Sequence, residues 1–436
     1  MSKLLHIVSL GCNKNLVDTE VMLGRLQEYT MSDDPAASDV IIVNTCGFID
    51  AAKEESVNTI LDLHSQRKED STLVVAGCLS ERYREELAVE MPEVDLFTGV
   101  GDYERIDALL ESKTSQFSDE VYLIDGADRV VTGSTYHAYI KLSEGCNQQC
   151  SFCAIPSFKG KLNSRTLDSV AKEVERLVAK GYYDFSFISQ DSSSFLRDEG
   201  ISDGLILLIK RIELIDGVKS ARILYLYPST TTSKLIQTIG ASKIFHNYFD
   251  MPIQHINDEM LRIMKRGFGK EKTHGLLQEM KNLPNAFIRT SFIVGHPGET
   301  EEMFEEMRDY AVNFGFDRVT VFDYSHEEGT SAYDLPEIDP EIKEDRLNRM
   351  QDAVDALNEK NLSKMVGLEL EVVVDGESDE HEFLLSAKAL HWAPDIDGEI
   401  YINESEIEPL EYGVIYKAKI TEIAGSIAMA TILADA

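Results

Sequence analysis

The sequence lacks the features that would place a chain in a membrane or send it out of the cell. No run of 18 apolar residues occurs among its 436 residues, and no charged-then-apolar leader opens it. A helix that crosses a bilayer needs about 20 predominantly apolar residues. We therefore expect a cytoplasmic, soluble protein without a membrane partner. There is also no Gly-x-x-x-x-Gly-Lys-Ser/Thr motif, which argues against a nucleoside-triphosphatase.

Basic residues are scarce as well. The chain has 42 Lys and Arg against 77 Asp and Glu, a formal net charge of −35. Because contacts to phosphate depend on Lys and Arg, direct binding of nucleic acid is disfavoured. The same charge would attract a strongly basic protein, or it could serve solubility alone.

Cysteine is rare, but half of it is concentrated in one stretch. Three of the six cysteines are Cys146, Cys150 and Cys153. So few cysteines in a long cytosolic chain do not suggest a disulfide scaffold, whereas closely spaced thiolates are typical ligands of a soft metal or an iron–sulfur cluster. Three thiolates on a four-iron cluster would leave one iron open for a substrate or cofactor. A zinc site with an open position and unrelated buried thiols are the alternatives.

The other three cysteines each follow an apolar, β-branched run. Cys12, Cys46 and Cys78 come directly after residues 6–11, 40–45 and 72–77, with helical patterns over 16–27 and 51–66 and a fourth strand expected over 94–98. Such runs predict central strands of a doubly wound parallel sheet, in which loops beyond the carboxyl ends gather around ligands. The three cysteines could therefore converge on a second cluster. The alternative is three small buried residues at tight turns.

Residues 136–322 repeat a strand-then-helix pattern six times. The expected strands are Tyr139–Ser143, Phe185–Ser189, Ala221–Leu226, Tyr248–Met251, Phe287–Val294 and Arg318–Phe322. Six such units predict a parallel barrel or an open partial barrel with its functional groups at the carboxyl ends of the strands. The Cys146 stretch follows the first strand. Gln190 and Asp191 follow the second, and Gly295 and Glu299 follow the fifth, so we expect them on the same rim.

The last part of the chain changes period. A charged helical segment from Glu341 to Ser363 is expected to connect the barrel to five short period-two runs, which predict a small antiparallel β-barrel. We therefore divide this α/β protein into residues 1–130, 131–365 and 366–436. Residues 371–436 hold 15 acidic and 3 basic residues, a net side-chain charge of −12. The single Trp392 is either an exposed anchor for a partner or a packing residue.

Two motifs of the central part resemble the radical S-adenosylmethionine superfamily. They are Cys146-x-x-x-Cys150-x-x-Cys153, with Phe152 before the last cysteine, and Ile293-Val-Gly295-His-Pro-Gly298-Glu299. The resemblance implies that the three cysteines hold a catalytic 4Fe–4S cluster that binds S-adenosylmethionine and cleaves it to a 5′-deoxyadenosyl radical. It also implies that Phe152, Gln190, Asp191, Gly295 and Glu299 shape the cofactor pocket.

The N-terminal sequences are similar to those of the methylthiotransferase family. The matching segments are Ser9-Leu-Gly-Cys12-Asn-Lys14-Asn-Leu-Val-Asp-Thr-Glu20, Val43-Asn-Thr-Cys46-Gly-Phe-Ile49 and Gly77-Cys78. The resemblance implies an auxiliary 4Fe–4S cluster on Cys12, Cys46 and Cys78, and a C-terminal TRAM domain. The segments Lys14–Asp18, Ser189–Asp191, Tyr225–Pro228, Asp323–Thr330 and Ala393–Gly398 most resemble the branch that inserts a methylthio group at the β-carbon of an aspartate in ribosomal protein twelve of the small subunit.

The resemblance further implies a basic ribosomal protein as substrate, an external electron donor and a monomeric enzyme. The sister reaction on a tRNA adenosine and a non-catalytic iron–sulfur or electron-transfer module are the alternatives. Two positions depart from the family's pattern, with Lys159 in place of an arginine and Asn257 in place of a serine. We expect these to change local contacts only.

Overall fold

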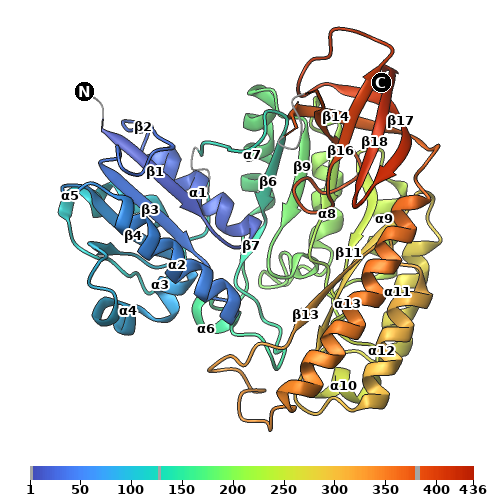
Figure 1. Cartoon of the computed structure of the whole chain (residues 1–436), viewed down its shortest axis with the longest axis horizontal. Helices are drawn as coiled ribbons and strands as arrows, with labels where there is room; N and C mark the ends of the chain where they lie inside the picture. Colours follow the sequence, from blue (N-terminus) through green and yellow to red (C-terminus); the bar gives the residue numbers. More distant parts are fainter. Residues whose placement is uncertain (1–2, 126–128, 379–382) are drawn as a thin grey trace.

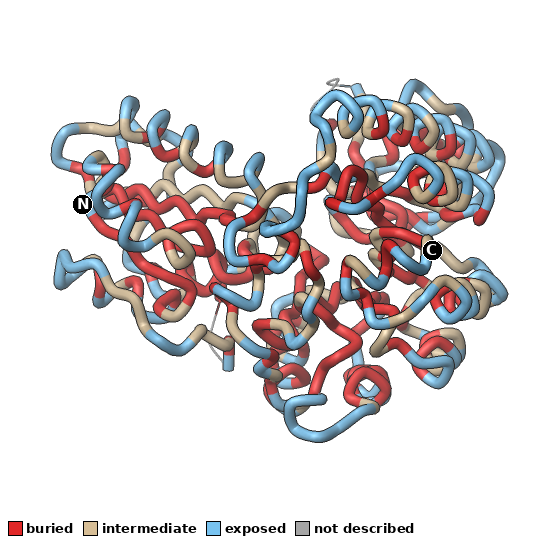
Figure 2. The backbone as a smooth tube through the Cα atoms, turned by 90° about the horizontal axis from the view of Figure 1, so that it is seen from below, coloured by how far each residue is buried: buried red, intermediate tan, exposed pale blue. Residues whose placement is uncertain are grey.

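The computed structural model describes residues 3–125, 129–378 and 383–436 (Figure 1). Its strands form a five-stranded sheet, a six-stranded sheet, a closed barrel and a short two-stranded ribbon. The strands are buried at the centre of each unit, and the exposed residues lie mainly on outer helices and loops (Figure 2). Among the described helices, none combines the length and the apolar character that a membrane crossing requires.

The N-terminal unit is a doubly wound parallel sheet, as the sequence predicts. Its strands are β1 (Leu4–Ser9), β2 (Thr30–Met31), β3 (Val40–Thr45), β4 (Thr72–Gly77) and β5 (Leu96–Phe97), and its helices are α1 (Asn13–Arg25), α2 (Asp50–Gln66), α3 (Cys78–Arg82), α4 (Arg84–Glu90) and α5 (Ile106–Ser112), with a 3₁₀ turn at Tyr103–Arg105. The strand order is β2-β1-β3-β4-β5, all parallel. The sequence did not predict β2, because two exposed residues carry no hydrophobic period.

Alternation along β3 explains why helices cover both faces of this sheet. Val40 and Ile42 pack in the cluster that contains α1, whereas Ile41 and Val43 pack with α2 on the other face. The strand order reverses between β1 and β3, which makes their carboxyl ends the topological switch point where such sheets bind ligands. Cys12 follows β1 and Cys46 follows β3.

The central unit is an open six-stranded parallel sheet, which confirms the partial barrel. Its strands, in the spatial order β13-β12-β11-β10-β9-β6, are β6 (His137–Lys141), β9 (Asp184–Ile188), β10 (Ser220–Ile223), β11 (Phe245–Asp250), β12 (Phe287–Val294) and β13 (Arg318–Asp323). The helices between them are α7 (Leu167–Ala179), α8 (Gly204–Ile212), α9 (Ser233–Ala241), α10 (Asp258–Ile263), α11 (Lys270–Lys281) and α12 (Glu301–Phe314). β10 ends three residues earlier than expected, before Tyr225, whose backbone adopts a φ of +61°.

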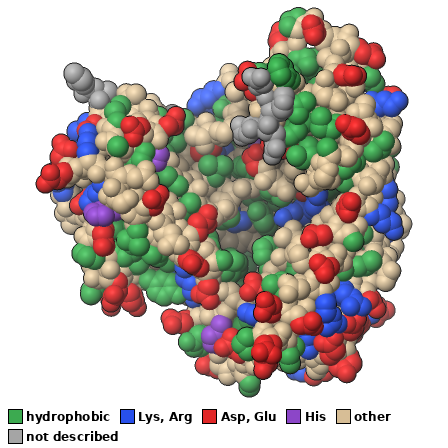
Figure 3. Space-filling view, in the orientation of Figure 1, with side chains coloured by type: hydrophobic (Ala, Val, Ile, Leu, Met, Phe, Trp, Pro, Cys, Tyr) green, Lys and Arg blue, Asp and Glu red, His purple; other side chains and the backbone are tan. Residues whose placement is uncertain are grey.

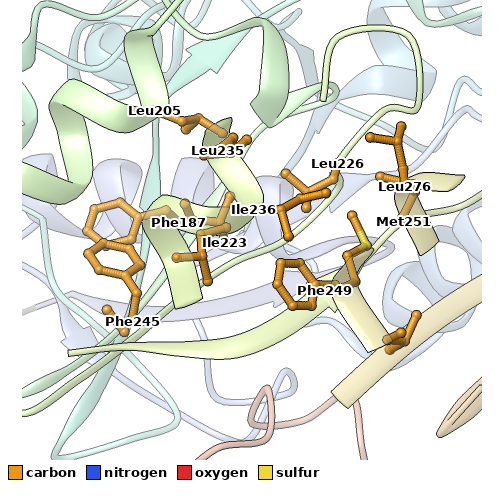
Figure 4. Close-up of a cluster of buried hydrophobic side chains, with 14 of the residues drawn as sticks. Phe187, Leu205, Ile223, Leu226, Leu235, Ile236, Phe245, Phe249, Met251 and Leu276 are labelled. Atoms are coloured by element: carbon orange, nitrogen blue, oxygen red, sulfur yellow. The ribbon is translucent and has the colours of Figure 1, made fainter. Parts of the chain in front are cut away.

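The two faces of the central sheet have opposite chemistry. On the helix side, apolar side chains such as Phe187, Ile223 and Phe249 pack against helices α8, α9 and α11 (Figure 4). Buried polar and charged residues alternate with them along the strands: His137, Lys141, Asp184, Ser186, Arg222 and Asp250. Because successive strand residues point to opposite faces, these groups lie on the concave side of the sheet. The concave side is therefore equipped to bind polar ligands.

A long helix covers the edge of this sheet. Helix α13 (Pro340–Ser363) packs Met350, Val354 and Leu357 into the core of the central unit. Its Asn358 side chain donates to the carbonyl of Val319 and accepts from that residue's N–H, at 3.1 and 3.3 Å. An unpaired strand edge would invite association with other chains, and α13 protects the edge at β13.

The C-terminal unit is a closed barrel, and one of its strand pairings differs from the prediction. Its strands are β14 (Glu369–Glu377), β15 (Leu385–Ala389), β16 (Ile400–Ser405), β17 (Ile415–Ala424) and β18 (Ile427–Asp435). The prediction of a purely antiparallel barrel is wrong at one seam, because β16 and β18 pair in parallel. This pairing closes the barrel between strands that are not consecutive in the sequence. Trp392 is only 3% exposed in the barrel's core, so it is a packing residue and not an exposed anchor.

The loop between β15 and β16 joins this barrel to the concave face of the central sheet. The Leu390 carbonyl accepts from Arg222 at 2.8 Å, and the Pro394 carbonyl accepts from the Tyr139 hydroxyl at 2.6 Å. Arg318 donates to the Asp397 carbonyl at 2.6 Å. The Ala393–Gly398 motif therefore builds the interface between the C-terminal barrel and the central sheet.

Half-buried histidines near Arg222 should make the fold sensitive to acid. Burial, followed by the charge of Arg222, lowers the pKa of His246 to about 3 and that of His391 to about 4. Below pH 6.5 these histidines bind a proton in the unfolded chain but not in the folded chain. The free energy of unfolding therefore decreases as the pH falls below 6.5. At pH 5.5 the loss is about 1.4 kcal/mol for each histidine. Denaturant unfolding at pH 7.5 and 5.5 should show a smaller loss for His391→Phe than for the wild type, and equal losses would contradict this.

Candidate active site

The three N-terminal cysteines converge because a glycine lies next to each of them in the chain. A Cβ on Gly11 would lie 2.9 Å from the sulfur of Cys46, and a Cβ on Gly47 would lie 2.7 Å from the Cα of Leu79, the residue after Cys78. Glycine therefore lets the turns after β1, β3 and β4 approach one another. Cys46 and Cys78 each lie within the electrostatic influence of Cys12.

Asn15 in the first turn of α1 ties these turns together. Its amide nitrogen donates to the carbonyls of Leu10 and Thr45, at 3.1 and 3.0 Å, and its amide oxygen lies 3.6 Å from the sulfur of Cys78. One buried side chain thus contacts the ends of β1 and β3 and the start of α3. Sequence reasoning did not single out Asn15, because its role depends on three segments that are far apart in the chain.

The second cysteine stretch forms a loop closed at its base. The ribbon of β7 (Ser143–Glu144) and β8 (Asn163–Ser164) pairs the chain before and after the loop, and helix α6 (Ile155–Lys159) follows the last cysteine. The N–H of Cys146 donates to the carbonyl of Gly160 at 3.1 Å. A Cβ on Gly145, which has a φ of +75°, would lie 2.2 Å from the carbonyl oxygen of Lys161. Glycine is required there for the loop to close.

The residues between these cysteines hold the loop against the end of β12. The hydroxyl of Ser151 hydrogen bonds with His296 at 2.9 Å, and its N–H donates to the carbonyl of Met264 at 3.0 Å. The ring of Phe152 meets that of His296 edge to face, with centroids 6.2 Å apart. Phe152 therefore lies beside the Gly295 segment, as the sequence predicts for the two motifs.

Two residues that the sequence did not single out as ligands or catalysts contact Cys150. The guanidinium of Arg266 lies 3.2 Å from its sulfur, and the hydroxyl of Tyr227 lies 3.4 Å from it. Arg266 also stacks over the Tyr227 ring at 4.2 Å. Arg266 thus donates a hydrogen bond to the sulfur of Cys150. The contact between Arg266 and Cys150 could not be predicted from the sequence, because the two residues lie 116 positions apart.

Gln190 and Asp191 lie at the end of β9 and contact the cysteine loop. The Asp191 carboxylate accepts from Gln148 at 2.8 Å and from Ser193 at 2.7 Å. The amide of Gln190 donates to Glu144, the residue before Gly145. Both residues therefore position the loop that carries Cys146.

Gly295 and Glu299 lie at the end of β12, where they contact α13. The Glu299 carboxylate accepts from Arg346 at 2.9 Å and from the N–H of Gly295 at 3.3 Å. Burial raises the pKa of Glu299 to about 7, although the charge of Arg346 opposes the shift. A Cβ on Gly295 would lie 2.4 Å from the Lys343 side chain. These residues hold α13 against the rim that also carries Phe152.

Burial disfavours the thiolate form of at least one cysteine in each set. It raises the pKa of Cys46 to about 11, and those of Cys146 and Cys153 to about 12. A cationic iron–sulfur centre would reverse this preference, because metal ligation deprotonates a thiol. Among the residues that the structure describes, no three His, Cys, Asp or Glu side chains lie close enough to share a single metal ion.

A buried network of four charges connects the two cysteine sets. Lys141 on β6 pairs with Asp18 on α1 and, at 2.8 Å, with Glu144; Lys159 lies 3.5 Å from both carboxylates. Burial would raise the pKa of Glu144, but the two lysines lower it to about 2. Lys159, one of the two positions that depart from the family's pattern, thus takes part in this network.

A second contact joins the N-terminal unit to the end of β13. Glu327, 1% exposed, accepts from Arg82 on α3 at 2.6 Å and from Lys53 on α2 at 3.0 Å. Glu327 belongs to the Asp323–Thr330 motif. The two units thus meet at the carboxyl ends of their strands, and the space-filling view shows this face hollowed between them (Figure 3).

The comparisons with known proteins agree with this architecture. Residues 4–99 match the Uncharacterized protein family UPF0004, residues 140–311 the Radical SAM superfamily and residues 366–426 the TRAM domain. Among solved structures, the radical S-adenosylmethionine methyltransferase TsrM from Kitasatospora setae shares the fold, with TM-scores of 0.53 and 0.55 in two structures. Both are 15% identical to the chain; the alignments cover 74% and 73% of this chain, and 72% and 73% of theirs. The fold and the cysteine loop define a radical SAM enzyme.

Full-length relatives define the family. The chain is 66% identical over 433 residues to the ribosomal protein uS12 methylthiotransferase RimO of Sulfurimonas denitrificans, covering 99% of both chains. It is 58% identical to the protein of the same name from Campylobacter jejuni, covering 97% of this chain and 96% of the other. The chain belongs to the RimO family of methylthiotransferases.

The buried charge network should contribute strongly to stability. Asp18→Asn leaves Lys141 and Lys159 with one carboxylate in place of two. Removing one partner from a buried ion pair costs about 3–5 kcal/mol. Chemical unfolding should therefore begin at a lower denaturant concentration in this variant. Asp216→Asn, at an exposed position after α8, is the matched control, and equal midpoints for the two variants would refute the network's role.

Proposed function

We propose that this protein inserts a methylthio group at the β-carbon of an aspartate in ribosomal protein uS12. The observation that carries the proposal is the position of the segment Tyr225–Tyr227 between the two cysteine sets. The Tyr225 ring lies 3.5 Å from the ammonium of Lys14, two residues after Cys12, and the hydroxyl of Tyr227 lies 3.4 Å from Cys150. A substrate that enters between these residues would be within reach of both sets.

The cysteines are suited to two different tasks. Cys146, Cys150 and Cys153 would hold a 4Fe–4S cluster, and Cys12, Cys46 and Cys78 would hold a second one. Together with S-adenosylmethionine, the clusters supply the radical that removes hydrogen and the sulfur that replaces it. The chain's own residues position these parts. Phe152, Gln190, Asp191, Gly295 and Glu299 would shape the S-adenosylmethionine pocket, directly or by fixing the loops around it.

Arg266 and Tyr227 surround the sulfur of Cys150, one of the three cysteines in the 146–153 loop. Arg266 would stabilise the negative charge of Cys150 and tune the reduction potential of the cluster, since hydrogen bonds to cluster sulfurs set that potential. The ring of Tyr227, under Arg266, would limit access of water to the same sulfur. The site thus combines a polar concave floor with a shielded cluster loop.

The acidity of the surface fits the proposed substrate. The chain carries a net charge of −35, and the C-terminal barrel contributes to it strongly. Such a surface attracts a basic ribosomal protein and disfavours direct contact with RNA. An external electron donor, a monomeric state, a cytoplasmic location and domain boundaries after residues 130 and 365 complete the proposal.

Cysteine variants separate the two centres. Cys146→Ala should abolish formation of 5′-deoxyadenosine under reduction, because the S-adenosylmethionine site loses a ligand. Cys46→Ala should still form 5′-deoxyadenosine but should transfer no methylthio group. Iron analysis after anaerobic reconstitution should give about eight irons per wild-type chain and about four in each variant. Methylthio transfer by Cys46→Ala would contradict the auxiliary role.

The substrate is identified by mass. Wild-type enzyme, incubated with reductant and S-adenosylmethionine, should add one methylthio group to a single aspartate of ribosomal protein uS12, as measured by mass spectrometry of the protein and its peptides. The Cys46→Ala variant is the matched control. Modification of tRNA adenosine in place of the ribosomal protein would refute the proposal.

A further inference from the structure

Lys14 is a buried cation without a counter-ion. Its side chain lies in the first turn of α1, and the residue is 9% exposed. In the described part of the chain, no hydrogen-bond acceptor or carboxylate pairs with its ammonium, which instead lies 3.5 Å from the centre of the Tyr225 ring. Lys141 and Lys159, which are also buried, each have two carboxylates within 4.0 Å. A cation over one aromatic ring recovers only part of the cost of burying a charge.

The neighbouring groups do not supply the missing negative charge. Tyr225 is a phenol, which is neutral at ordinary pH. Two carboxylates act on Lys14 from a distance, and each has another partner. Glu144 pairs with Lys141 at 2.8 Å, and Asp250 accepts from the N–H of Tyr225 at 3.0 Å and pairs with Arg289 at 3.0 Å. The side-chain nitrogen of Asn13, beside Lys14, is also buried and has no partner among the described residues. Among the described residues, the start of α1 therefore carries two donor nitrogens without an acceptor.

The start of helix α1 adds to this preference for an anion. Its first turn contains no acidic residue, and the side chain of Cys12 does not cap it. The free N–H groups and dipole of a helix N-terminus favour negative charge. The helix end alone would define no site, but here it coincides with an unpaired buried lysine.

The position of Lys14 relates this anion site to the reaction. Lys14 follows Cys12 by two residues, and it contacts Tyr225, two residues before the Tyr227 hydroxyl that touches Cys150. A substrate side chain bound between Lys14 and Tyr227 would lie next to Cys150 and close to the turn that carries Cys12. Lys and Arg side chains are visible in the wall of the hollow on this face (Figure 3).

We propose that Lys14 binds the side-chain carboxylate of the target aspartate and thereby determines the substrate. This inference rests on the proposed function. The carboxylate carbon is bonded to the β-carbon, so an ion pair with Lys14 would fix the reacting carbon between the two centres. A nucleobase carries no such charge, and Lys14 therefore favours an acidic residue in a polypeptide over an adenosine.

The test compares two peptides of the ribosomal protein, one with the target aspartate and one with asparagine in its place. Wild-type enzyme should prefer the aspartate peptide in both Kd and kcat/KM for methylthio transfer. Lys14→Met should lower kcat/KM for the aspartate peptide about 10- to 150-fold, the value of a charged hydrogen bond. It should also bring the affinity ratio of the two peptides close to one. Lys210→Met, at an exposed position on α8, is the matched control and should behave as wild type.

Further readouts separate specificity from structure. Lys14→Met should keep the iron content of the wild type, and Lys210→Met should keep both the iron content and the substrate-free formation of 5′-deoxyadenosine. The inference is overturned if the variant keeps the wild-type ratio of affinities for the two peptides, whatever its KM for S-adenosylmethionine. It is equally overturned if the wild type binds both peptides alike, a result that does not depend on how the variant folds. If the wild type modifies neither peptide nor the whole ribosomal protein, the proposed function fails first.

Discussion

The buried pairing of Asp18, Lys141, Glu144 and Lys159 is the constraint on which the rest of the structure depends. Each of the four residues is at most 3% exposed. Asp18 lies on α1, Lys141 on β6, Glu144 on β7 and Lys159 on α6. Charges buried this deeply are tolerated only when they pair with good geometry. Helix α1, strand β6 and the loop with Cys146 are therefore held in one relative arrangement. That arrangement makes the rims of two separate sheets face each other.

The candidate active site lies where the carboxyl ends of the N-terminal and central sheets face each other. Each parallel sheet directs its loops beyond its carboxyl ends, and each set of three cysteines lies on such loops. A sheet on its own could present one set of thiols to solvent. Docked rim to rim, with Glu327 forming a second contact, the two sheets bring Lys14 against Tyr225 and Cys150 against Tyr227. The geometry suits a reaction in which one substrate carbon meets two reactive centres.

The C-terminal barrel is attached to the concave face of the central sheet. Period-two alternation puts apolar side chains under the helices and leaves groups such as Arg222 and Asp250 inside the open barrel. The Ala393–Gly398 loop reaches these strands and pairs with their polar side chains, while Trp392 packs in the core of the C-terminal barrel. The small barrel is therefore fastened to the central unit, and its acidic outer surface remains available to a basic partner.

Local pattern in the sequence determined the elements, the fold class and both cysteine sets, because burial on one or two faces leaves a readable period in each strand and helix. Short elements such as β2 and the parallel seam between β16 and β18 left no such signal, since two residues have no period and pairing direction is set by closure. Only the tertiary structure decided that Asn15 joins three turns, that Arg266 lies against Cys150 and that Lys14 has no counter-ion in residues 3–125, 129–378 and 383–436. Those roles depend on which distant residues come within hydrogen-bond distance, and on which buried charge is left without a partner. Neither property belongs to any single stretch of the chain.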